Sequence, residues 1–348
     1  MRTTIKDIAK KTGLSVTTVS LVLNGKPNKI PQRTRELVLS AARELHYRPN
    51  QLAVGLVKRQ TRIIGVVVPD ITNPFFARLV KAIEDKAAQS GFHIILCNSW
   101  HQRERDAENI EMLLDKGVDG ILYLFSSGIS EQEVEKTCMT IRGAGIPVVL
   151  IDHPSRFAGA SSVSLDNQLG GYIAVRHLLD EGHRQIGFIT GPKHSLLSTA
   201  RLKGAKKALR EEELPFHESM CFEGDYQFDS GALAADYFLQ KNVTAVFSFN
   251  DMMALSFIRR TTEAGRKIPA DLSIIGFDDE VFCQYMAIPL TTVRQPVQEM
   301  GEAAARAMIE LLSRETECIQ RVFLPNLVVR ASTAPPAHRR EHSLLYDQ

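Results

Sequence analysis

Side chains that could hold a polyhydroxylated ligand stand directly after apolar, strand-like runs across residues 62–289 of the sequence. In sheets of parallel strands a ligand lies beyond the carboxyl ends of the strands, so residues at these positions are candidates for one common site. Carboxylates and amides exchange hydrogen bonds with hydroxyl groups, a guanidinium donates them, and flat rings stack on apolar sugar faces. The candidates are Asp70, Asn73, Phe75, Phe76, Asp152, Arg201, Tyr226, Asn250, Asp251, Asp278 and Asp279.

Some of these candidates have a structural explanation instead. One of Phe75 and Phe76 is expected to pack in a core, and Asp279 is explained equally well as a cap or turn residue beside Asp278. The set that we predict to bind an effector is Phe75, Phe76, Asp152, Arg201, Tyr226, Asn250, Asp251 and Asp278. A sugar phosphate would require more positive charge than Arg201 supplies, so a neutral sugar fits this set best.

Motifs of enzymes and of metal sites are missing from the 348 residues. We find no GxxxxGKS phosphate loop, no HExxH and no GxSxG. The five cysteines (Cys97, Cys138, Cys221, Cys283 and Cys318) show no CxxC or Cys/His spacing and are expected to be reduced thiols. We therefore predict no catalytic residue, no metal and no cofactor. Paired carboxylates across a cleft still leave acid–base catalysis open, and an assay of sugar turnover decides that question.

The elements that must position these residues alternate between strand and helix patterns from Arg62 onward. Runs such as IIGVVVP and TAVFSFN predict buried strands, and FARLVKAIEDKAAQSG predicts an amphipathic helix. Repeated βα units predict an α/β body of two doubly wound parallel-sheet lobes, at about 62–160 and 162–289. TTVRQP is expected to cross back to the first lobe, the helix EMGEAAARAMIELLS to rejoin that lobe, and VFLPNLVVRAS to return to the second. Several crossings between the lobes make a cleft that can close.

The first 47 residues carry a different, all-α pattern. Thr4 is expected to cap a helix over residues 5–11, Gly13 to turn the chain, and Ser15 to cap a second helix. Val19 and Val22 then point inward, and a third helix over 31–46 supplies the remaining apolar face. We predict that face to consist of Leu37, Val38, Ala41, Ala42 and Leu45. This arrangement is typical of a helix-turn-helix head.

The second helix of this head would present candidate DNA-reading side chains. Thr methyls and Val suit the thymine methyl group, and Thr hydroxyls suit bases or phosphates. The DNA-contacting residues that we predict are Thr4, Ser15, Val16, Thr17, Thr18, Ser20, Leu21, Asn24, Asn50 and Leu56. Charge supports this prediction, because residues 1–60 hold 12 Lys and Arg against 3 Asp and Glu, whereas the remaining residues hold 30 against 37. An ordinary αα-hairpin with a solvated basic arm is the alternative.

An ordered series of motifs resembles the lactose/galactose-repressor family of bacterial transcription regulators. These motifs are TIKDIAKKTGLSVTTVSLVLNG, YRPNQLAVGL, IGVVVPDITNPFFARLVKAIEDKAAQSGF, GHRQIGFITGP, FSFNDMMAL, IPADLSIIGFDD and PLTTVRQP, and they reach to about residue 332. The resemblance implies a body of the periplasmic-binding-protein type and a role in effector contact for Arg201, for Asn250 or Asp251, and for Asp278. It also implies aromatic walls at Phe75, Phe76 and Tyr226.

The resemblance further implies a hinge helix that forms on DNA and inserts Leu56 into the minor groove at the operator centre. Asn50 is placed to cap this short helix, which is marginal by itself. One departure from the family, at Leu21, concerns DNA reading, and a second is Pro31, which stands where the family often has a Ser or Thr helix cap. Leu21 stands where an arginine often reads guanine, so this position is expected to read a different base. Ser195 and Leu197 replace an arginine and a threonine of purine-binding relatives, which argues against a purine effector.

Taken together, these features predict four segments. They are a helix-turn-helix domain at 1–47, a hinge helix at 48–60, an effector-binding and dimerisation body at 61–332 and a flexible tail at 333–348. The predicted function is a dimeric repressor that binds a palindromic operator and responds to a sugar-like effector. Without an 18-residue apolar stretch, a signal-peptide core or leucine heptads in the tail, we expect a cytoplasmic homodimer rather than a membrane protein or tetramer. A sugar receptor without a DNA role, and a regulator answering to a corepressor or partner protein, are the alternatives.

Overall fold

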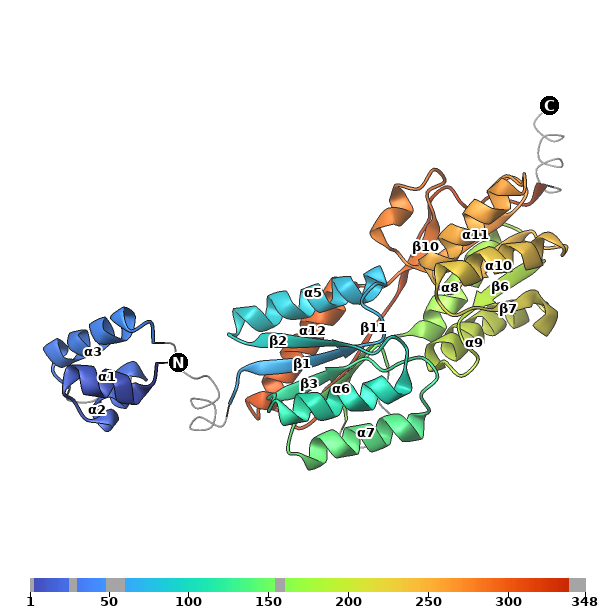
Figure 1. Cartoon of the computed structure of the whole chain (residues 1–348). Coiled ribbons are helices and arrows are strands. Elements are labelled where there is room, and N and C mark those ends of the chain that lie inside the picture. Colours follow the sequence, from blue (N-terminus) through green and yellow to red (C-terminus); the bar gives the residue numbers. More distant parts are fainter. Residues whose placement is uncertain (1–2, 25–29, 48–59, 154–159, 338–348) are drawn as a thin grey trace. The chain divides into compact units, whose positions relative to one another are not determined.

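The computed structural model describes residues 3–24, 30–47, 60–153 and 160–337. Contacts divide the chain into two compact units, a head (Met1–Thr61) and a body (Arg62–Gln348), which are drawn in Figure 1. The predicted hinge helix and most of the predicted tail fall outside the described residues.

The described residues of the head form three helices, α1 (Ile5–Thr12), α2 (Val16–Leu23) and α3 (Gln32–Glu44). Their apolar faces meet in one small core, in which Ile8, Val19 and Val38 are fully buried. The predicted third helix is confirmed, but one residue of its predicted apolar face is wrong. Leu37 is 50% exposed, because the buried stripe of α3 runs through Val38, Ala41 and Ala42.

The predicted helix boundaries of the head have direct structural causes. Thr4 precedes α1, and its backbone N–H donates to Asp7 Oδ2 at 2.8 Å. Gly13 ends α1 with φ of 68°, a conformation that glycine adopts without strain. Ser15 Oγ accepts from the backbone N–H of Thr18 at 3.1 Å and so begins α2. These caps fix the turn between the first two helices.

The first lobe of the body is built on a six-stranded sheet of order β11-β5-β4-β3-β1-β2. All its pairings are parallel. Its strands are β1 (Ile63–Val68), β2 (His93–Asn98), β3 (Gly120–Tyr123), β4 (Val148–Ile151), β5 (Ser161–Leu165) and β11 (Gln320–Phe323), and its helices are α5 (Pro74–Gln89), α6 (Arg103–Asp115), α7 (Glu131–Gly143) and α12 (Val297–Leu312). Figure 1 shows α5 on the opposite face of this sheet from α6 and α7.

The second lobe repeats this architecture, with a six-stranded sheet of order β12-β10-β9-β8-β6-β7. Its strands are β6 (Ile186–Thr190), β7 (Cys221–Glu223), β8 (Ala245–Ser248), β9 (Ser273–Asp278), β10 (Thr291–Arg294) and β12 (Asn326–Val328), and its helices are α8 (Asn167–Asp180), α9 (Leu196–Glu211), α10 (Phe228–Leu239) and α11 (Asp251–Glu263). The edge strand β12 is antiparallel to β10, and the other pairings are parallel. The two short 3-10 turns are Glu218–Met220 and Val281–Gln284.

The chain crosses between the lobes three times, as the sequence predicts. It leaves the first lobe after β5, returns between β10 and α12, and leaves again between β11 and β12. The predicted boundary near residue 160 is wrong, because β5 pairs with β4 and belongs to the first sheet. The run SVSLDN predicts a strand here, which is confirmed, and all five residues of β5 are buried, but the strand lies inside the first lobe rather than the second.

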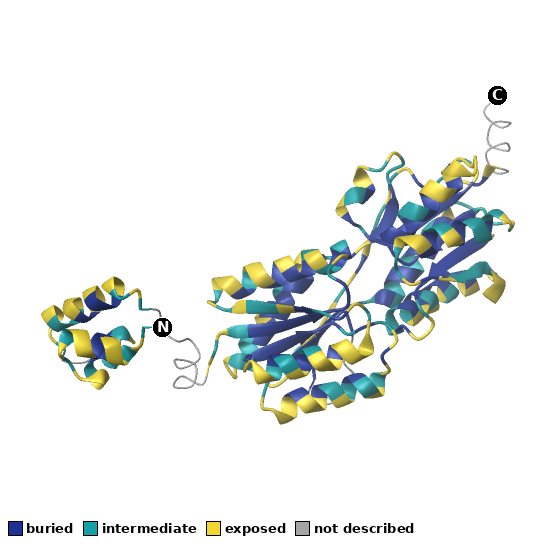
Figure 2. Ribbon diagram, in the orientation of Figure 1, coloured by how far each residue is buried: buried dark blue, intermediate teal, exposed yellow. Residues whose placement is uncertain are grey.

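Apolar side chains of both sheets are covered by helices, and Figure 2 shows the buried strands inside an exposed helical surface. This pattern is the one expected of parallel sheets with helices on both faces. None of the helices in the described part of the chain is long and apolar enough to cross a membrane. The body therefore provides two rigid lobes, and the carboxyl ends of their strands position the site described next.

Candidate ligand-binding cavity and DNA-reading helix

A cavity lies between the two lobes, at the carboxyl ends of their strands, with an empty space of about 770 Å³ that includes its open mouth. The first lobe lines it with residues that follow β1, β2, β3 and β4, and the second lobe with residues that follow β6, β7, β8 and β9. Gln295, directly after β10, completes the lining. Seven of the eight predicted effector residues line this cavity: Phe75, Phe76, Asp152, Arg201, Tyr226, Asn250 and Asp278.

Arg201 is the cation of the cavity and is only 3% exposed. Its Nε donates to Asn167 Oδ1 at 2.8 Å, a second guanidinium nitrogen donates to the backbone carbonyl of Phe249, and its Cζ lies 3.6 Å from the centre of the Phe277 ring. These contacts fix the plane of the guanidinium. A buried, oriented cation of this kind can donate to ligand hydroxyl or carbonyl oxygens with little loss of conformational entropy.

Two glycines bring α9, which carries Arg201, into close contact with α8. A Cβ at Gly171 would lie 1.9 Å from the carbonyl oxygen of Arg201, and a Cβ at Gly204 would lie 1.8 Å from the carbonyl oxygen of Gln168. Any side chain at either position would push the helices apart. The spacing of α8 and α9 therefore sets where the Arg201 guanidinium meets the cavity.

Asp152 brings a buried carboxylate to the cavity from the end of β4. It is 7% exposed, has φ of 61°, and its Oδ1 has no hydrogen-bond partner among the described residues. Burial raises the pKa of Asp152 to about 6, while the nearby Arg201 and a hydrogen bond with Asn167 oppose this shift. A buried acceptor without a donor is costly, so a ligand hydroxyl that donates to it would be stabilised.

Gln295 and Asp278 form a second polar group of the lining. Gln295 Nε2 donates to Asp278 Oδ1 at 2.7 Å, while Gln295 Oε1 is buried without a hydrogen-bond partner in the part of the chain that is described. Burial raises the pKa of Asp278 well above its usual range, and Arg201 opposes this shift. The cavity therefore offers two unsatisfied acceptors, Asp152 Oδ1 and Gln295 Oε1.

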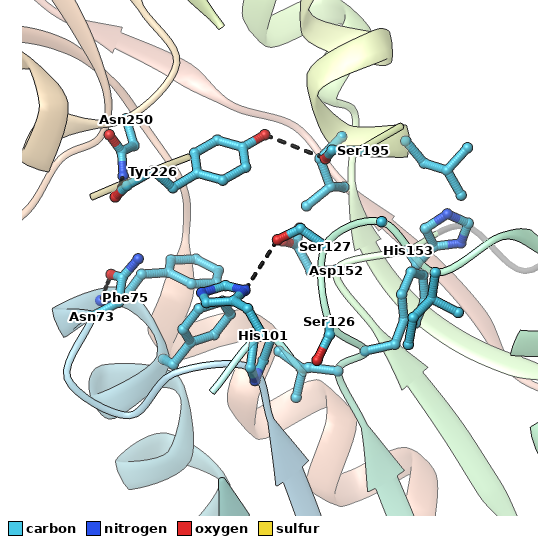
Figure 3. A pocket seen from close by; sticks show the side chains of 18 of the residues that line it. Asn73, Phe75, His101, Ser126, Ser127, Asp152, His153, Ser195, Tyr226 and Asn250 are labelled. Carbon is cyan, nitrogen blue, oxygen red and sulfur yellow. Dashed lines mark hydrogen bonds between the residues drawn. The ribbon is translucent and has the colours of Figure 1, made fainter. Parts of the chain in front are cut away.

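Aromatic rings enter the cavity from both lobes, as Figure 3 shows for Phe75 and Tyr226. Phe75 is buried and packs edge-on against the half-buried Phe76, with ring centres 5.2 Å apart, which agrees with the expectation that one of the two packs in the core. The Tyr226 hydroxyl lies 3.4 Å from Ser195 Oγ. A Cβ at Gly191 would lie 2.1 Å from Tyr226 Cζ, so this glycine makes room for the ring.

Asp251 does not line the cavity, contrary to its place in the predicted set. Its fully buried carboxylate accepts from the Thr292 hydroxyl at 2.7 Å, from the backbone N–H of Glu280 at 2.8 Å and from Cys283 Sγ at 3.1 Å. These bonds tie α11 to the β9–β10 connection. Its neighbour Asn250 lines the cavity, begins α11 through Oδ1, and donates from Nδ2 to the carbonyl of Tyr226 at 2.8 Å.

The remaining strand-end candidates have structural partners. Asn73 lines the cavity, and its Oδ1 accepts from the backbone N–H of Phe75 at 3.0 Å. Asp70 accepts from the backbone N–H and the hydroxyl of Thr72. Asp279 pairs with Arg294 and Arg330, both at 2.6 Å, so its partners are structural, although they are ion pairs rather than the expected cap or turn contacts.

The sequence candidates left out most of the lining, namely Pro69, His101, Leu124, Phe125, Ser126, Ser127, Gly128, Ile129, Ile151, His153, His194, Ser195, Leu196, Leu197 and Gln295. Most of these residues follow strands that the prediction had identified, so the strand-end rule could have found them. His101 Nδ1 and Ser127 Oγ lie 3.1 Å apart across two neighbouring loops, as the dashed line in Figure 3 marks. Among the described residues no group of three or more His, Cys, Asp or Glu side chains could hold a metal ion.

The predicted DNA-contacting residues that the structure describes lie at the start of α1 or along α2 and its two caps. Val16 and Thr17 at the start of α2, with Thr4, Ser15 and Asn24 beside the helix ends, are exposed. Thr18, Ser20 and Leu21 are half-buried. The hydroxyls of Ser15 and Thr18 lie 2.8 Å apart, and Asn24 Nδ2 donates to the Ser20 carbonyl at 2.8 Å. Asn50 and Leu56 lie outside the described residues.

The sequence and the fold of this chain are similar to those of known proteins. A family model described as bacterial regulatory proteins, lacI family, matches residues 4–50, and a periplasmic binding protein-like domain matches residues 175–333. The transcriptional regulator DegA of Bacillus subtilis is 36% identical over 337 residues, which span 96% of this chain and 99% of DegA.

Solved structures resemble the chain over nearly all of its length. The Lac repressor dimer bound to operator and the anti-inducer ONPF matches with a TM-score of 0.85 at 27% identity, over 96% of this chain and 100% of that one. The transcriptional regulator CelR in complex with cellobiose matches with a TM-score of 0.71 at 30% identity, over 95% of this chain and 100% of that one. Both head and body are thus like those of DNA-binding regulators.

Proposed function

Because this chain belongs to the lacI family of bacterial regulatory proteins, we propose that it represses transcription until a small neutral sugar enters the cavity between its lobes. It is a DNA-binding transcriptional regulator with a ligand-binding body, and it acts as a dimer rather than as an enzyme. Its partners are operator DNA, a small effector and a second copy of the chain. The proposal places the protein in the cytoplasm, where its DNA lies.

The sugar proposal rests above all on the two buried acceptors, Asp152 Oδ1 and Gln295 Oε1. Hydroxyl groups donate to such acceptors and also accept from a guanidinium, which Arg201 supplies. The aromatic rings of Phe75 and Tyr226 offer flat surfaces for the C–H faces of a ring. The Asp152 carboxylate lies beside the guanidinium of Arg201 and disfavours a phosphorylated effector, because a phosphate would add charge of the wrong sign.

Operator recognition is assigned to the exposed side chains of α2 and to the hinge. We assign Val16 and Thr17, which are exposed, to base edges in the major groove, whereas Leu21 has no hydrogen-bond donor and favours a thymine methyl over guanine. We assign residues 48–60 to a hinge helix whose Leu56 wedges the operator centre, between a head at 1–47 and a body at 61–332, with a tail at 333–348. Asn50 would cap that helix.

Effector and operator are coupled if the lobes take two arrangements and only one fits the operator. An inducer would favour the lobe arrangement that does not fit the operator. We propose that the effector is such an inducer, so that its binding weakens operator binding. A corepressor, or a partner protein that binds the body, would favour the other arrangement. A sugar receptor without a DNA role is the remaining alternative, but it does not explain the basic charge of the head.

Selection of DNA fragments from a random pool by the purified protein, at moderate salt, tests the proposal. An inverted repeat with a flexible centre supports a dimeric repressor, and the bound fragment then serves as the probe for sugars that release it. Salt-sensitive binding without sequence preference contradicts the repressor proposal for the protein alone. If added phosphocarrier protein, but no sugar, then restores selection of an inverted repeat, the partner-protein alternative replaces the sugar.

A further inference from the structure

One loop supplies a large part of the first lobe's side of the cavity. It follows β3 and leads to α7, and each of its residues 124–129 lines the cavity. Figure 3 labels Ser126 and Ser127 on this loop. Ordering a loop at the moment of binding costs free energy, so a loop that is already held in place favours a ligand. The contacts that hold this loop therefore bear on effector binding.

A carboxylate outside the cavity makes such contacts. Asp106 lies in the first turn of α6, is only 2% exposed and does not line the cavity. Its Oδ2 accepts from the backbone N–H of Ser126 at 2.9 Å, and its Oδ1 accepts from the Ser126 hydroxyl at 3.1 Å. The hydroxyl of Tyr123, at the end of β3, donates to Oδ2 at 3.1 Å. The carboxylate thus binds the loop directly and also the strand that leads into it.

The cost of burying this carboxylate ties it to the loop. Burial raises the pKa of Asp106, and hydrogen bonds from Ser126, Ser99 and Tyr123 oppose this shift. A buried carboxylate is costly without such donors, so the loop cannot move away without leaving the charge uncompensated. One turn further along α6, Asn109 Nδ2 lies 3.3 Å from Ser99 Oγ. The start of α6 therefore holds both the connection after β2 and the loop after β3.

We infer that Asp106 is a positioning residue of the ligand site, which holds residues 124–129 in the place where they line the cavity. Asp106 acts through the loop and does not touch the ligand. The inference goes beyond the proposed function, because it applies to any small effector that this loop contacts. Only the titrations with sugars described below rest on the proposed function.

Amide hydrogen exchange on the full-length protein tests this role without a ligand. Asp106→Leu removes both acceptors, so exchange in the peptide that covers residues 124–129 is expected to become at least about tenfold faster. Asp106→Asn is expected to change it by less than about threefold, because its amide can accept from the Ser126 N–H and donate to the Ser126 hydroxyl. Asp115→Leu, at an exposed position at the end of α6 and outside the cavity, is the matched control.

Isothermal titration calorimetry then tests whether the position of the loop serves the ligand. The probes are methyl β-D-glucopyranoside, methyl β-D-galactopyranoside and D-ribose. A probe that binds the natural protein is expected to bind Asp106→Leu at least about tenfold more weakly, and to bind Asp106→Asn nearly as tightly as before. Affinity for the selected operator without sugar is expected to stay within about twofold, a separation that general loss of structure would not produce.

Each remaining outcome decides the inference. Unchanged exchange in a folded Asp106→Leu protein overturns it, and so does faster exchange with unchanged affinity for a probe. If no probe binds the natural protein, the sugar proposal fails, and hydrogen exchange alone decides the role of Asp106. If Asp106→Leu does not fold, Tyr123→Phe takes its place, since it removes one donor to Asp106 at a position outside the cavity. Exchange about threefold faster in that variant supports the inference, and unchanged exchange overturns it.

Discussion

Arg78 Nη1 on α5 of the first lobe lies 3.3 Å from the Glu280 carboxylate of the second lobe, and the Glu280 side chain is 1% exposed. Arg78 Nη1 also donates to the carbonyl of Asp279 at 3.1 Å. The same helix begins beside Phe75, which forms a wall of the cavity. A contact between the lobes is therefore carried by a helix that also lines the cavity between them.

Arg78→Met is expected to destabilise the body by about 2 kcal/mol at pH 8, because it leaves the buried Glu280 carboxylate uncompensated while Arg78 itself is partly solvated. Burial raises the pKa of Glu280, and Arg78 opposes this shift. Without Arg78 the carboxyl takes up a proton more readily, so the loss should shrink as the pH falls towards 5. Urea denaturation at the two pH values measures this difference.

Lys81→Met is the matched control, since Lys81 lies on the same helix and pairs with Asp85 at the surface, where both side chains are more than half exposed. Such a pair contributes at most about 0.5 kcal/mol. Equal losses for the two variants at both pH values would show that the buried pair with Glu280 does not hold the lobes together.

The strand-end rule brought seven of the eight predicted effector residues to the cavity, although most of the other lining residues were not predicted from sequence. Asp152, Tyr226 and Asn250 each follow a recognisable strand, and parallel strands bring such residues to one edge. Asp251 follows the same rule but points to Thr292 and Cys283, which are 41 and 32 residues away in sequence. The residues next to Asp251 in the sequence do not indicate these partners, because only the folded chain brings them close to Asp251.

The close approach of α8 to α9 and the space for the Tyr226 ring could not be predicted from local sequence patterns either. In the sequence, Gly191 is simply a residue that follows a strand. Its role depends on Tyr226, which comes from a different loop and packs over it in the folded protein. Leu37 fits the helical period of α3, yet its neighbour Val38 is the residue that meets the head core. Helical periodicity predicts the buried stripe of a helix to within about one residue. Packing of α3 against the other two described helices of the head decides which side of that stripe is buried.

Arg201→Met is expected to abolish release of the operator by the effector while operator binding itself persists. The variant removes the guanidinium of the cavity and leaves the carbonyl of Phe249 and Asn167 Oδ1 without their donor, so effector affinity should fall at least about 100-fold. Fluorescence anisotropy of a labelled operator, with and without effector, measures both quantities.

Lys203→Met on the same helix is the control for Arg201→Met, because Lys203 is exposed and lies outside the cavity. A circular-dichroism spectrum and melting curve establish that each variant is folded. An Arg201→Met protein that folds and still releases its operator at the normal effector concentration would remove Arg201 from the ligand site.

Gly191→Ala is expected to weaken effector binding about tenfold or more. Its Cβ would occupy space within 2.1 Å of Tyr226 Cζ, so the ring must leave its position over the cavity. Gly143→Ala is the control, since a Cβ there meets nothing within 4 Å. Calorimetry with the effector compares the two proteins, and unchanged affinity in a folded Gly191→Ala protein would mean that Tyr226 does not form a wall of the site.

Leu56→Ala is expected to weaken binding to the selected operator about tenfold and to leave effector binding unchanged. An alanine is too short to unstack the central base step, whereas binding to phosphates by the head is retained. Specific and nonspecific affinities, measured on the operator and on a scrambled duplex, separate the two contributions. Parallel loss on both duplexes would indicate damage to the head rather than loss of a wedge.

The effector affinity is expected to fall as the pH drops below about 6. Burial raises the pKa of Asp152 to about 6, and a ligand hydroxyl that donates to Oδ1 favours the ionised form. Ligand binding therefore lowers the pKa of Asp152. The effector affinity is constant at pH values where the carboxylate of the free protein is already ionised. Below the pKa of the free protein, the affinity declines by up to tenfold per pH unit.

Asp152→Asn separates this titration from that of other lining groups, such as Asp278, whose pKa is also raised, and His101, whose pKa burial lowers. The amide cannot ionise, so its affinity should be lower at pH 8 and should change little between pH 8 and pH 5. If the affinity of the variant falls with pH in parallel with that of the natural protein, the proton is taken up elsewhere, and Asp152 Oδ1 is not the acceptor of the sugar.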